Sequence, residues 1–418
     1  MKKLFTLAFV LAAFGFQAKA QCPANDSTQM GSGTGNDVFY SLENGTVTTI
    51  SNTNWHMAFS VQEFTTPQTA ALSAAVRVNS GGNGTIVKRL DNANPANWRA
   101  IDTTGLSAMP QLLDSDSTWN LSAFTSGYKV SSPFDFKWGT YDQNTHHITG
   151  TKVYVIQNTA AGFYKKVFVS KLHYDTVWNV IISNIDNSDS VYLTINKRDY
   201  TGKMFVYYNA STNQVLDREP AMSSWDLLWT KYVTWVTSPQ GSGYYPVAGV
   251  LSHPKVKVEQ NNGKTCNMVW LHTKTSVVDP RISAIGHDWK TFTGTAYVIT
   301  DTFVYFVRAQ DSAMYKLTFL SYAGGPLGKS VFNVYEATLG IDKINAAKLR
   351  IFPNPNSGVF SVESEVPVQH ISIVDMQGKT VYSSDTAGKM DVSGLADGIY
   401  IVKVHTTAGV YHQQIIKE

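Results

Sequence analysis

One pattern in this sequence occurs twice, and that duplication limits what the chain can fold into more than any other feature. An aromatic run followed by a tryptophan appears first as Phe39–Leu42 with Trp55, and again as Val206–Asn209 with Trp225. The second copy keeps the order of the first. Self-similarity over such a long period is the signature of a repeated structural unit.

A second matching pair lies further along each copy. A strand-like run around Tyr164 in the first copy corresponds to one around Tyr315 in the second, and the spacing between matching elements is shorter in the second copy. Shorter spacing with the same order indicates a duplicated domain whose loops differ in length. We therefore expect two modules, residues 37–200 and residues 201–338.

The composition favours strands over helices in both modules. Charged residues make up only 16% of the 418 residues and aromatic residues 12%, while the apolar runs are short and broken by Gly, Asn, Asp and Pro. Such runs are typical of β-strands joined by turns, and the length exceeds what one hydrophobic core usually serves. The fold class that we predict is all-β, with two tandem antiparallel modules and a small C-terminal β-sandwich like an immunoglobulin domain at residues 349–418. Linkers are expected at residues 21–36 and 339–348.

The N-terminus has the three regions of a secretory signal peptide. Lys2 and Lys3 precede an apolar run, which ends in the small-residue motif Ala18–Ala20. We expect a signal peptide at residues 1–20, cleaved near Ala20. No later stretch approaches the roughly 20 apolar residues of a transmembrane helix. The net charge of +3 is small, so nucleic acid is not expected as a partner.

Cys22 and Cys266 are the only cysteines of the chain. One disulfide between them could form, but nothing in the sequence requires it. Two cysteines cannot build a thiolate metal cluster, and no metal site is expected other than one that involves haem iron. Because Gln21 is not the small residue that precedes a lipid-modified cysteine, ordinary cleavage is expected.

The C-terminal stretch carries three ordered motifs, Phe352–Pro355, Gly378–Tyr382 and Leu395–Tyr400. With them it closely resembles the C-terminal sorting domain of the type IX secretion system of Bacteroidetes. The resemblance implies translocation across the outer membrane by the type IX machinery, engaged through residues 349–418. Surface attachment or release would follow. The alternative is an ordinary sandwich module that binds another molecule.

Both modules also resemble the HmuY-like family, all-β proteins of Bacteroidetes that capture haem. The matching motifs are Trp225–Tyr232, Arg77–Gly82, Trp138–Tyr141 and Met314–Tyr322, with a weaker counterpart at Trp55–Phe59. The resemblance implies the fold, and it implies haem as a bound ligand held in an aromatic pocket. Such haem would need one or two axial ligands, His or Met.

Candidate axial ligands occur in both modules. The resemblance points to the region of His146 and His147 in the first module, although its closest register places Trp138 or Thr140 at the ligand position. The remaining candidates belong to the second module or are more remote: His287, His272, His253, Met109, His173 and Met268. For any single histidine, an exposed residue or one bonded to a backbone carbonyl is the alternative.

The sequence contains no marked catalytic signature. It lacks a nucleophile elbow and a zinc-binding helix with paired histidines, and the glycine-rich segment Gly31–Gly35 does not lie between a strand and a helix. The tryptophans Trp55, Trp225, Trp229 and Trp235 are expected in the core. We expect a binding protein and not an enzyme. The competing hypothesis is a surface interaction protein that binds a protein or a glycan without haem.

Overall fold

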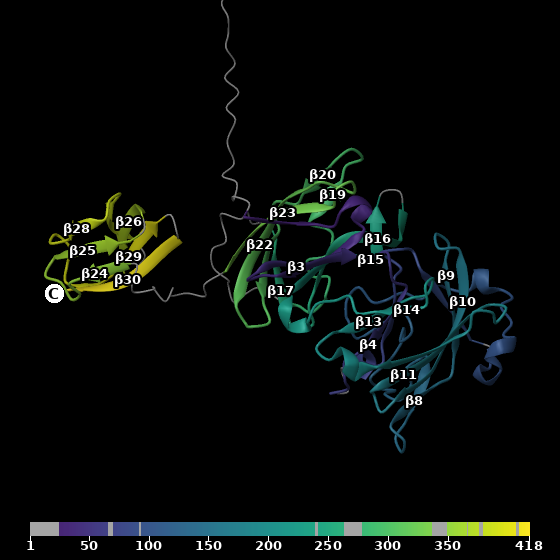
Figure 1. The fold of residues 1–418 in the computed structure, drawn as a ribbon. Coiled ribbons are helices and arrows are strands. Elements are labelled where there is room, and N and C mark those ends of the chain that lie inside the picture. The colour runs from purple at the N-terminus through teal and green to yellow at the C-terminus, as the bar shows by residue number, and fades with distance from the viewer. Residues whose placement is uncertain are drawn as a thin grey trace, which may run out of the picture. The chain divides into compact units, whose positions relative to one another are not determined.

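The computed structural model describes residues 25–65, 70–91, 93–238, 241–262, 278–336, 349–365, 367–375, 379–406 and 409–418. The chain divides into two compact units, residues 1–336 and residues 337–418, which we call the core unit and the tail unit. The expected signal peptide, both cysteines, His272 and Met268 lie outside the described residues. The described part of each unit consists of antiparallel β-sheets, as the fold class predicted (Figure 1).

The core unit has two lobes. Lobe A contains the strands from β4 to β14 and is continuous in sequence. Its first sheet has seven strands: β6 (Ile86–Leu90), β7 (Gly139–Asp142), β8 (His147–Gly150), β9 (Val153–Asn158), β10 (Phe163–His173), β11 (Val177–Asn184) and β12 (Val191–Asn196). Its second sheet has four, in the order β14 (Gln214–Leu216), β13 (Phe205–Asn209), β4 (Met57–Ser60) and β5 (Val76–Val78).

Lobe B combines the first strands of the chain with those from β15 to β23. Its larger sheet has the order β1 (Asp26–Gln29), β23 (Lys329–Glu336), β22 (Met314–Tyr322), β21 (Val304–Arg308), β17 (Lys257–Asn261) and β18 (Val278–Asp279). Its second sheet has the order β16 (Gly241–Ser252), β15 (Leu227–Ser238), β2 (Asn36–Ser41) and β3 (Gly45–Ser51). A separate hairpin joins β19 (Lys290–Phe292) to β20 (Tyr297–Ile299).

Helices are few and short in the described residues. One turn of α-helix, α1 (Ala70–Ser73), is accompanied by the 3-10 segments η1 (Ser32–Thr34), η2 (Pro95–Ala100), η3 (Leu106–Ala108), η4 (Lys197–Tyr200) and η5 (Met222–Ser224). No helix in the described part of the chain has the length and hydropathy of a membrane span.

The strands between the two lobes are buried on both faces. Val38 and Tyr40 belong to the core of lobe B, whereas Phe39 between them belongs to a third cluster, which we call the seam. On β4, Met57 and Phe59 enter the core of lobe A and Ala58 enters the seam. Because successive side chains of a strand point to opposite faces, each four-stranded sheet covers one lobe core and one side of the seam. This arrangement explains why the repeated runs are almost wholly apolar.

Each module contributes its first hairpin to the lobe built mainly from the other module. β2 pairs with β15, and β13 pairs with β4 (Figure 1). These pairings cross the boundary that the sequence analysis placed between residues 200 and 201. The two modules are therefore interleaved and do not form two successive sets of sheets. Both hairpins belong to corresponding parts of the repeat and have a similar aromatic pattern.

The register of the two exchanged pairings is the same, which supports the duplication that the sequence analysis inferred. Met57 lies opposite Tyr208 in lobe A as Leu227 lies opposite Tyr40 in lobe B. The tryptophans of the two repeats, Trp55 and Trp225, also make equivalent ring contacts. Trp55 meets the ring of Tyr207 edge-on at 4.9 Å, and Trp225 meets the ring of Phe39 edge-on at 5.2 Å.

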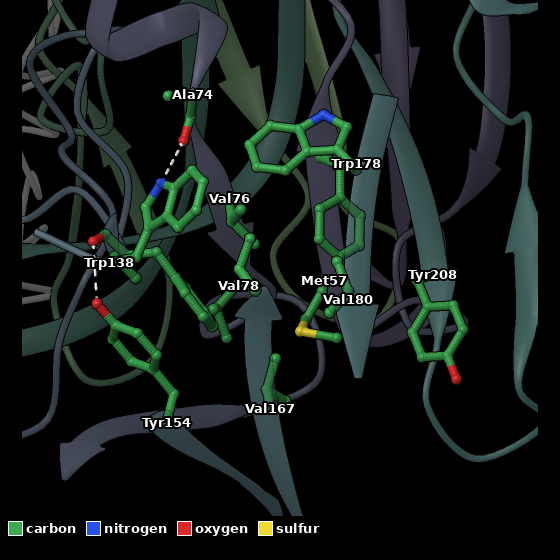
Figure 2. Packing of buried hydrophobic residues seen from close by; sticks show 14 of the residues in the cluster. Met57, Ala74, Val76, Val78, Trp138, Tyr154, Val167, Trp178, Val180 and Tyr208 are labelled. Carbon is green, nitrogen blue, oxygen red and sulfur yellow. Dashed lines mark hydrogen bonds between the residues drawn. The ribbon is translucent and has the colours of Figure 1, made fainter. Parts of the chain in front are cut away.

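The core of lobe A contains two of the largest buried side chains, Trp138 and Trp178 (Figure 2). Their ring centroids lie 5.6 Å apart. Each indole N–H donates to a backbone carbonyl, that of Trp138 to Ala74 at 3.0 Å and that of Trp178 to Ser60 at 2.9 Å. Buried indoles that keep a hydrogen-bond partner are placed in one orientation, so this core is a fixed support for the loops around it.

The tail unit is a small sandwich of two sheets, as predicted. Its core includes Ile351, Phe360, Ile373 and Val402. One sheet consists of β24 (Leu349–Phe352), β25 (Val359–Ser364) and β28 (Gly388–Asp391), and the other of β27 (Thr380–Ser384), β26 (Val368–Val374), β29 (Gly398–Thr406) and β30 (Gly409–Lys417).

Candidate functional site

An apolar cavity of about 560 Å³ opens at one end of lobe A. It lies between the β7–β8 hairpin and the connection from β10 to β11. Aromatic and aliphatic side chains make up more than half of its lining, and the charged side chains of Glu63, Asp175 and Arg198 stand among them. The lining side chains include Phe134, Tyr141, His146, Ile148, Leu172 and Tyr174. Concave, mostly apolar walls with a few polar groups are typical of small-molecule sites.

Two other cavities are smaller and differ in chemistry. One of about 390 Å³ is lined by polar groups that include Glu43, Asp226 and Asp311. The other, of about 80 Å³, lies at the seam. Of these three cavities, the one in lobe A has the greatest volume and has a histidine in its wall, so it is the candidate site.

The β7–β8 turn places His146 at the cavity. Asp142 begins this turn, and its Oδ1 accepts hydrogen bonds from the amides of Asn144 at 2.8 Å and Thr145 at 2.9 Å. Such side-chain acceptance is the usual way in which aspartate starts a turn. His146 then adopts a left-handed backbone with φ of 54°.

Tyr141 holds the imidazole of His146 in place. The Tyr141 hydroxyl lies 2.7 Å from Nδ1 of His146, and the Tyr141 ring stacks on Phe134 at 6.0 Å. When Nδ1 carries the proton and donates it to the phenol oxygen, Nε2 holds the free lone pair. A partner on one ring nitrogen fixes which nitrogen a ligand meets.

A buried lysine supports the floor of the cavity. The ammonium of Lys197 pairs with the lining residue Asp175 and donates to the carbonyls of Ser73 at 2.7 Å and Gln62 at 2.9 Å. Burial lowers the pKa of Lys197, and the carboxylate of Asp175 opposes that shift. These contacts tie the α1 segment to the β11 end of the wall.

His147, the neighbour of His146, does not line the cavity. Its ring packs edge-on against His173 at 4.8 Å and Tyr174 at 4.6 Å. Its Nδ1 accepts from the Tyr174 amide at 3.3 Å. His173 contacts Asn179 through Nε2, and burial together with Lys171 and His147 lowers its pKa. The structure therefore separates the roles of the two adjacent histidines.

The candidates of the second module lie elsewhere. His287 is half-buried in lobe B, and burial lowers its pKa. His253 is buried with its ring edge-on to Trp225 at 4.7 Å, and burial lowers its pKa to about 3. Met109, a more remote candidate from the first module, packs near Trp98 at the edge of a small apolar cluster. None of these residues lines the lobe A cavity, so the structure does not bring the predicted ligands of the two modules together.

Of the four tryptophans expected in the core, Trp225 and Trp229 are buried there, and Trp55 packs half-buried at the seam. Trp235 is 55% exposed on the β15–β16 hairpin, because that hairpin extends beyond its pairing with β2. The prediction for Trp235 was therefore wrong.

The sequence analysis missed most of the cavity wall. Phe134, Ile148 and the pair Leu172 and Tyr174 come from three segments that no sequence motif links, and of the wall aromatics only Tyr141 belongs to a predicted motif. The described residues hold no group of three or more His, Cys, Asp or Glu side chains placed for a metal ion. What the cavity offers chemically is apolar contact area, one oriented imidazole and the charged side chains of Glu63, Asp175 and Arg198.

Comparison with known proteins identifies one part of the chain. Residues 350–418 match the family described as the secretion system C-terminal sorting domain. A search of curated proteins gives no match. Among solved structures, the chain is similar to the N-terminal four Ig domains of Dscam1, isoform 7.44 (13% identity, 87% of this chain and 99% of that chain, TM-score 0.14) and isoform 8.4 (11% identity, 92% and 98%, TM-score 0.15).

Both TM-scores are too low to carry any conclusion about fold or function. The family match, by contrast, covers nearly the whole tail unit and agrees with the three motifs found in the sequence. Residues 350–418 are therefore a C-terminal sorting domain of the type IX secretion system, and the chain is a protein of the outer cell surface or a secreted protein.

Proposed function

We propose that this protein captures haem, or a flat apolar ligand of similar size, in the lobe A cavity and performs no chemistry on it. The observation that carries the proposal is the placement of His146, held by Tyr141, in the wall of a 560 Å³ apolar cavity. The likeness of residues 37–200 to the HmuY-like family supports the same ligand.

The residues present fit such a ligand. The volume lies within the roughly 300–1,000 Å³ that small-molecule pockets span. Phe134, Tyr141 and Tyr174 supply ring surfaces for a planar molecule. Imidazole nitrogen is a common axial ligand of haem iron, and the contact of Nδ1 with Tyr141 leaves Nε2 of His146 for this role. His147 and His287, which the sequence also suggested, lie outside the cavity wall.

Titration of the mature chain with haemin, followed by absorbance, tests the proposal. We expect a sharp Soret band with the wild-type chain and with the His147→Ala and His287→Ala variants. The His146→Ala variant should lose that band. The proposal fails if the wild-type spectrum equals that of haemin partitioned nonspecifically, or if His146→Ala leaves the spectrum unchanged.

A second candidate function rests on a different surface. The β15–β16 hairpin exposes Trp235 at 55%, Tyr244 at 64% and Tyr245 at 64%. No charged residue occurs from Tyr232 to Ser252. Uncharged, exposed tyrosine and tryptophan surface suits a neutral polar partner such as a glycan.

Binding of the chain to a set of neutral polysaccharides tests this second candidate. We expect the double variant Trp235→Ala/Tyr244→Ala to lose binding while haemin binding stays unchanged. Tyr192→Ala, which removes an equally exposed tyrosine of lobe A, serves as the matched control. Equal binding by the double variant would exclude the hairpin as a glycan site.

A further inference from the structure

The two lobes correspond residue by residue around the cavity. Trp138 in lobe A and Trp289 in lobe B are both buried, and each backbone carbonyl accepts a hydrogen bond at 2.9 Å, from Thr151 and from Thr300. The hairpin that follows each tryptophan also corresponds. β7 pairs with β8 in lobe A, and β19 pairs with β20 in lobe B.

The turn of this hairpin differs between the lobes. Asp142 pairs with His147 in lobe A, and the Thr293 amide donates to the Ala296 carbonyl at the same position in lobe B. Four residues separate the first pair, but only Gly294 and Thr295 separate the second. The turn that carries His146 is thus two residues longer than the lobe B turn, whose residues Gly294 and Thr295 include no histidine.

The wall residues also differ in size. Ile148, opposite Tyr141 in lobe A, corresponds to Tyr297, opposite Phe292 in lobe B. Leu172 pairs with Ile148, and the ring of Tyr322 meets that of Tyr297 edge-on at 4.8 Å in the corresponding place. Two aliphatic side chains of the cavity wall are thus replaced by two tyrosines.

Aromatic and cationic groups occupy the corresponding region of lobe B. Trp289 stacks on Phe319 at 3.7 Å. The ammonium of Lys290 lies 4.1 Å from the Trp289 ring and 4.8 Å from the Tyr322 ring, and it donates to the Ala248 carbonyl at 2.6 Å. Lobe A has Gly139 at the position of Lys290. The rings of Tyr297 and Tyr322 and the Lys290 chain therefore stand in lobe B at the positions that Ile148, Leu172 and Gly139 hold in lobe A.

We propose that the duplicated chain binds one ligand, in lobe A alone, and that three features select this lobe. These features are the longer turn that carries His146, the aliphatic side chain of Ile148 and the aliphatic side chain of Leu172. The inference rests on the proposed function for the identity of the ligand. The inference that only lobe A holds an open apolar cavity does not depend on the ligand being haem.

Two matched double variants test the inference. Ile148→Tyr/Leu172→Tyr gives lobe A the side chains of lobe B, and Tyr297→Ile/Tyr322→Leu gives lobe B those of lobe A. Each mature chain is titrated with haemin, followed by absorbance, and with anilinonaphthalene sulfonate, an apolar dye followed by fluorescence. Near-ultraviolet circular dichroism checks that both variants keep the native packing.

We expect one haemin and one high-affinity dye site per wild-type chain. The lobe A variant should bind both probes at least tenfold more weakly, whereas the lobe B variant should retain the lobe A site with unchanged affinity. Two equal sites in the wild type, or undiminished binding by the folded lobe A variant, would overturn the inference. If no haemin binds but one dye site disappears in the lobe A variant, the proposed ligand is wrong and the inference stands. Absence of a dye site from the wild type overturns the inference.

Discussion

Asp226 and His56 occupy equivalent positions in the two lobes and accept equivalent hydrogen bonds. Oδ2 of Asp226 accepts from the Leu42 amide at 2.9 Å, and Nδ1 of His56 accepts from the Ala210 amide at 3.0 Å. Each acceptor stands just before the strand with which an exchanged hairpin pairs. Burial, with a smaller effect of Lys165, lowers the pKa of His56 to about 4, so this imidazole is neutral and keeps its acceptor nitrogen. A side-chain acceptor thus holds the end of each exchanged strand.

Replacing Asp226 with alanine should destabilise the core unit. The carboxylate also accepts from the Gln310 amide at 3.3 Å, so Asp226→Ala leaves two amide donors without their acceptor. We expect a loss of about 3 kcal/mol in the free energy of unfolding, measured by urea denaturation with tryptophan fluorescence. Asp226→Asn keeps one acceptor oxygen and should lose less than half as much. Equal stability of the alanine variant and the wild type would contradict the role assigned to Asp226.

The stability of the core unit should fall as the pH rises through neutrality, because of Glu219. Burial raises its pKa from 4.5 to about 7, although its oxygens accept from the Phe205 amide at 2.9 Å and the Tyr207 hydroxyl at 2.8 Å. The folded chain therefore holds this proton more tightly than the unfolded chain. This contribution is fully present below pH 4.5 and is lost as the pH rises to about 7, for a change of roughly 3 kcal/mol.

The Glu219→Gln variant should remove this pH dependence. Urea denaturation at pH 5 and pH 8 compares it with the wild type and with Glu43→Gln, which changes an exposed carboxylate of the same unit. We expect the difference between the two pH values to shrink for Glu219→Gln alone. An unchanged difference would show that other groups dominate.

Gly81 marks a close approach between the lobes that no larger residue can make. A Cβ atom at this position would lie 2.4 Å from the Lys231 carbonyl oxygen and 2.7 Å from the Tyr232 Cα. Both neighbours are backbone atoms of β15, so they cannot move aside cheaply. We expect Gly81→Ala to reduce the free energy of unfolding by about 2 kcal/mol, as overpacking does. Gly243→Ala, where nothing lies within 4 Å of the added Cβ, is the control.

Tyr141→Phe should weaken haemin binding without unfolding lobe A. The variant keeps the ring that stacks on Phe134 and removes only the hydroxyl that orients His146. Loss of an outer partner of a ligating histidine weakens metal binding by roughly 10-fold to 100-fold. Haemin titration should show a change of this size, with Tyr164→Phe, an exposed tyrosine on β10, as the control. Unchanged affinity would exclude Tyr141 as a positioning residue.

Much of the fold follows from local patterns in the sequence. The short apolar run at Val38–Tyr40, the breaks at glycine and asparagine, and the correspondence of Trp55 with Trp225 predict strands and a duplication. The exchange of hairpins could not be predicted, because the two hairpins carry the same pattern around Tyr40 and Tyr208, and each pairs with its partner strand in the same register. Which strand each hairpin pairs with depends on the segments that connect the strands, and the side-chain pattern of the hairpins contains no information about those segments.

Only part of the candidate site could be predicted from the sequence. The sequence singled out His146 and His147 together, but the left-handed residue at the end of the turn decides which imidazole lines the cavity. Phe134 and Leu172 reach the cavity from segments with no motif in common. The open space itself results from Ile148 and Leu172 being smaller than Tyr297 and Tyr322, a difference visible only once the lobes are superposed in register.

The antiparallel pairing of β1 with β23 sets the order in which the molecule can be completed. The Val334 amide donates to the Asn25 side chain at 2.8 Å across a sequence separation of 309 residues. During synthesis the ribosome releases the N-terminal strand early, and its partner arrives only at the end of the core unit. The larger sheet of lobe B therefore has an unpaired edge until β23 has been synthesised. A chain that ends before residue 336 keeps that edge exposed to proteases and chaperones. It also lacks the sorting domain, so truncated products have an incomplete lobe B and no signal for type IX secretion.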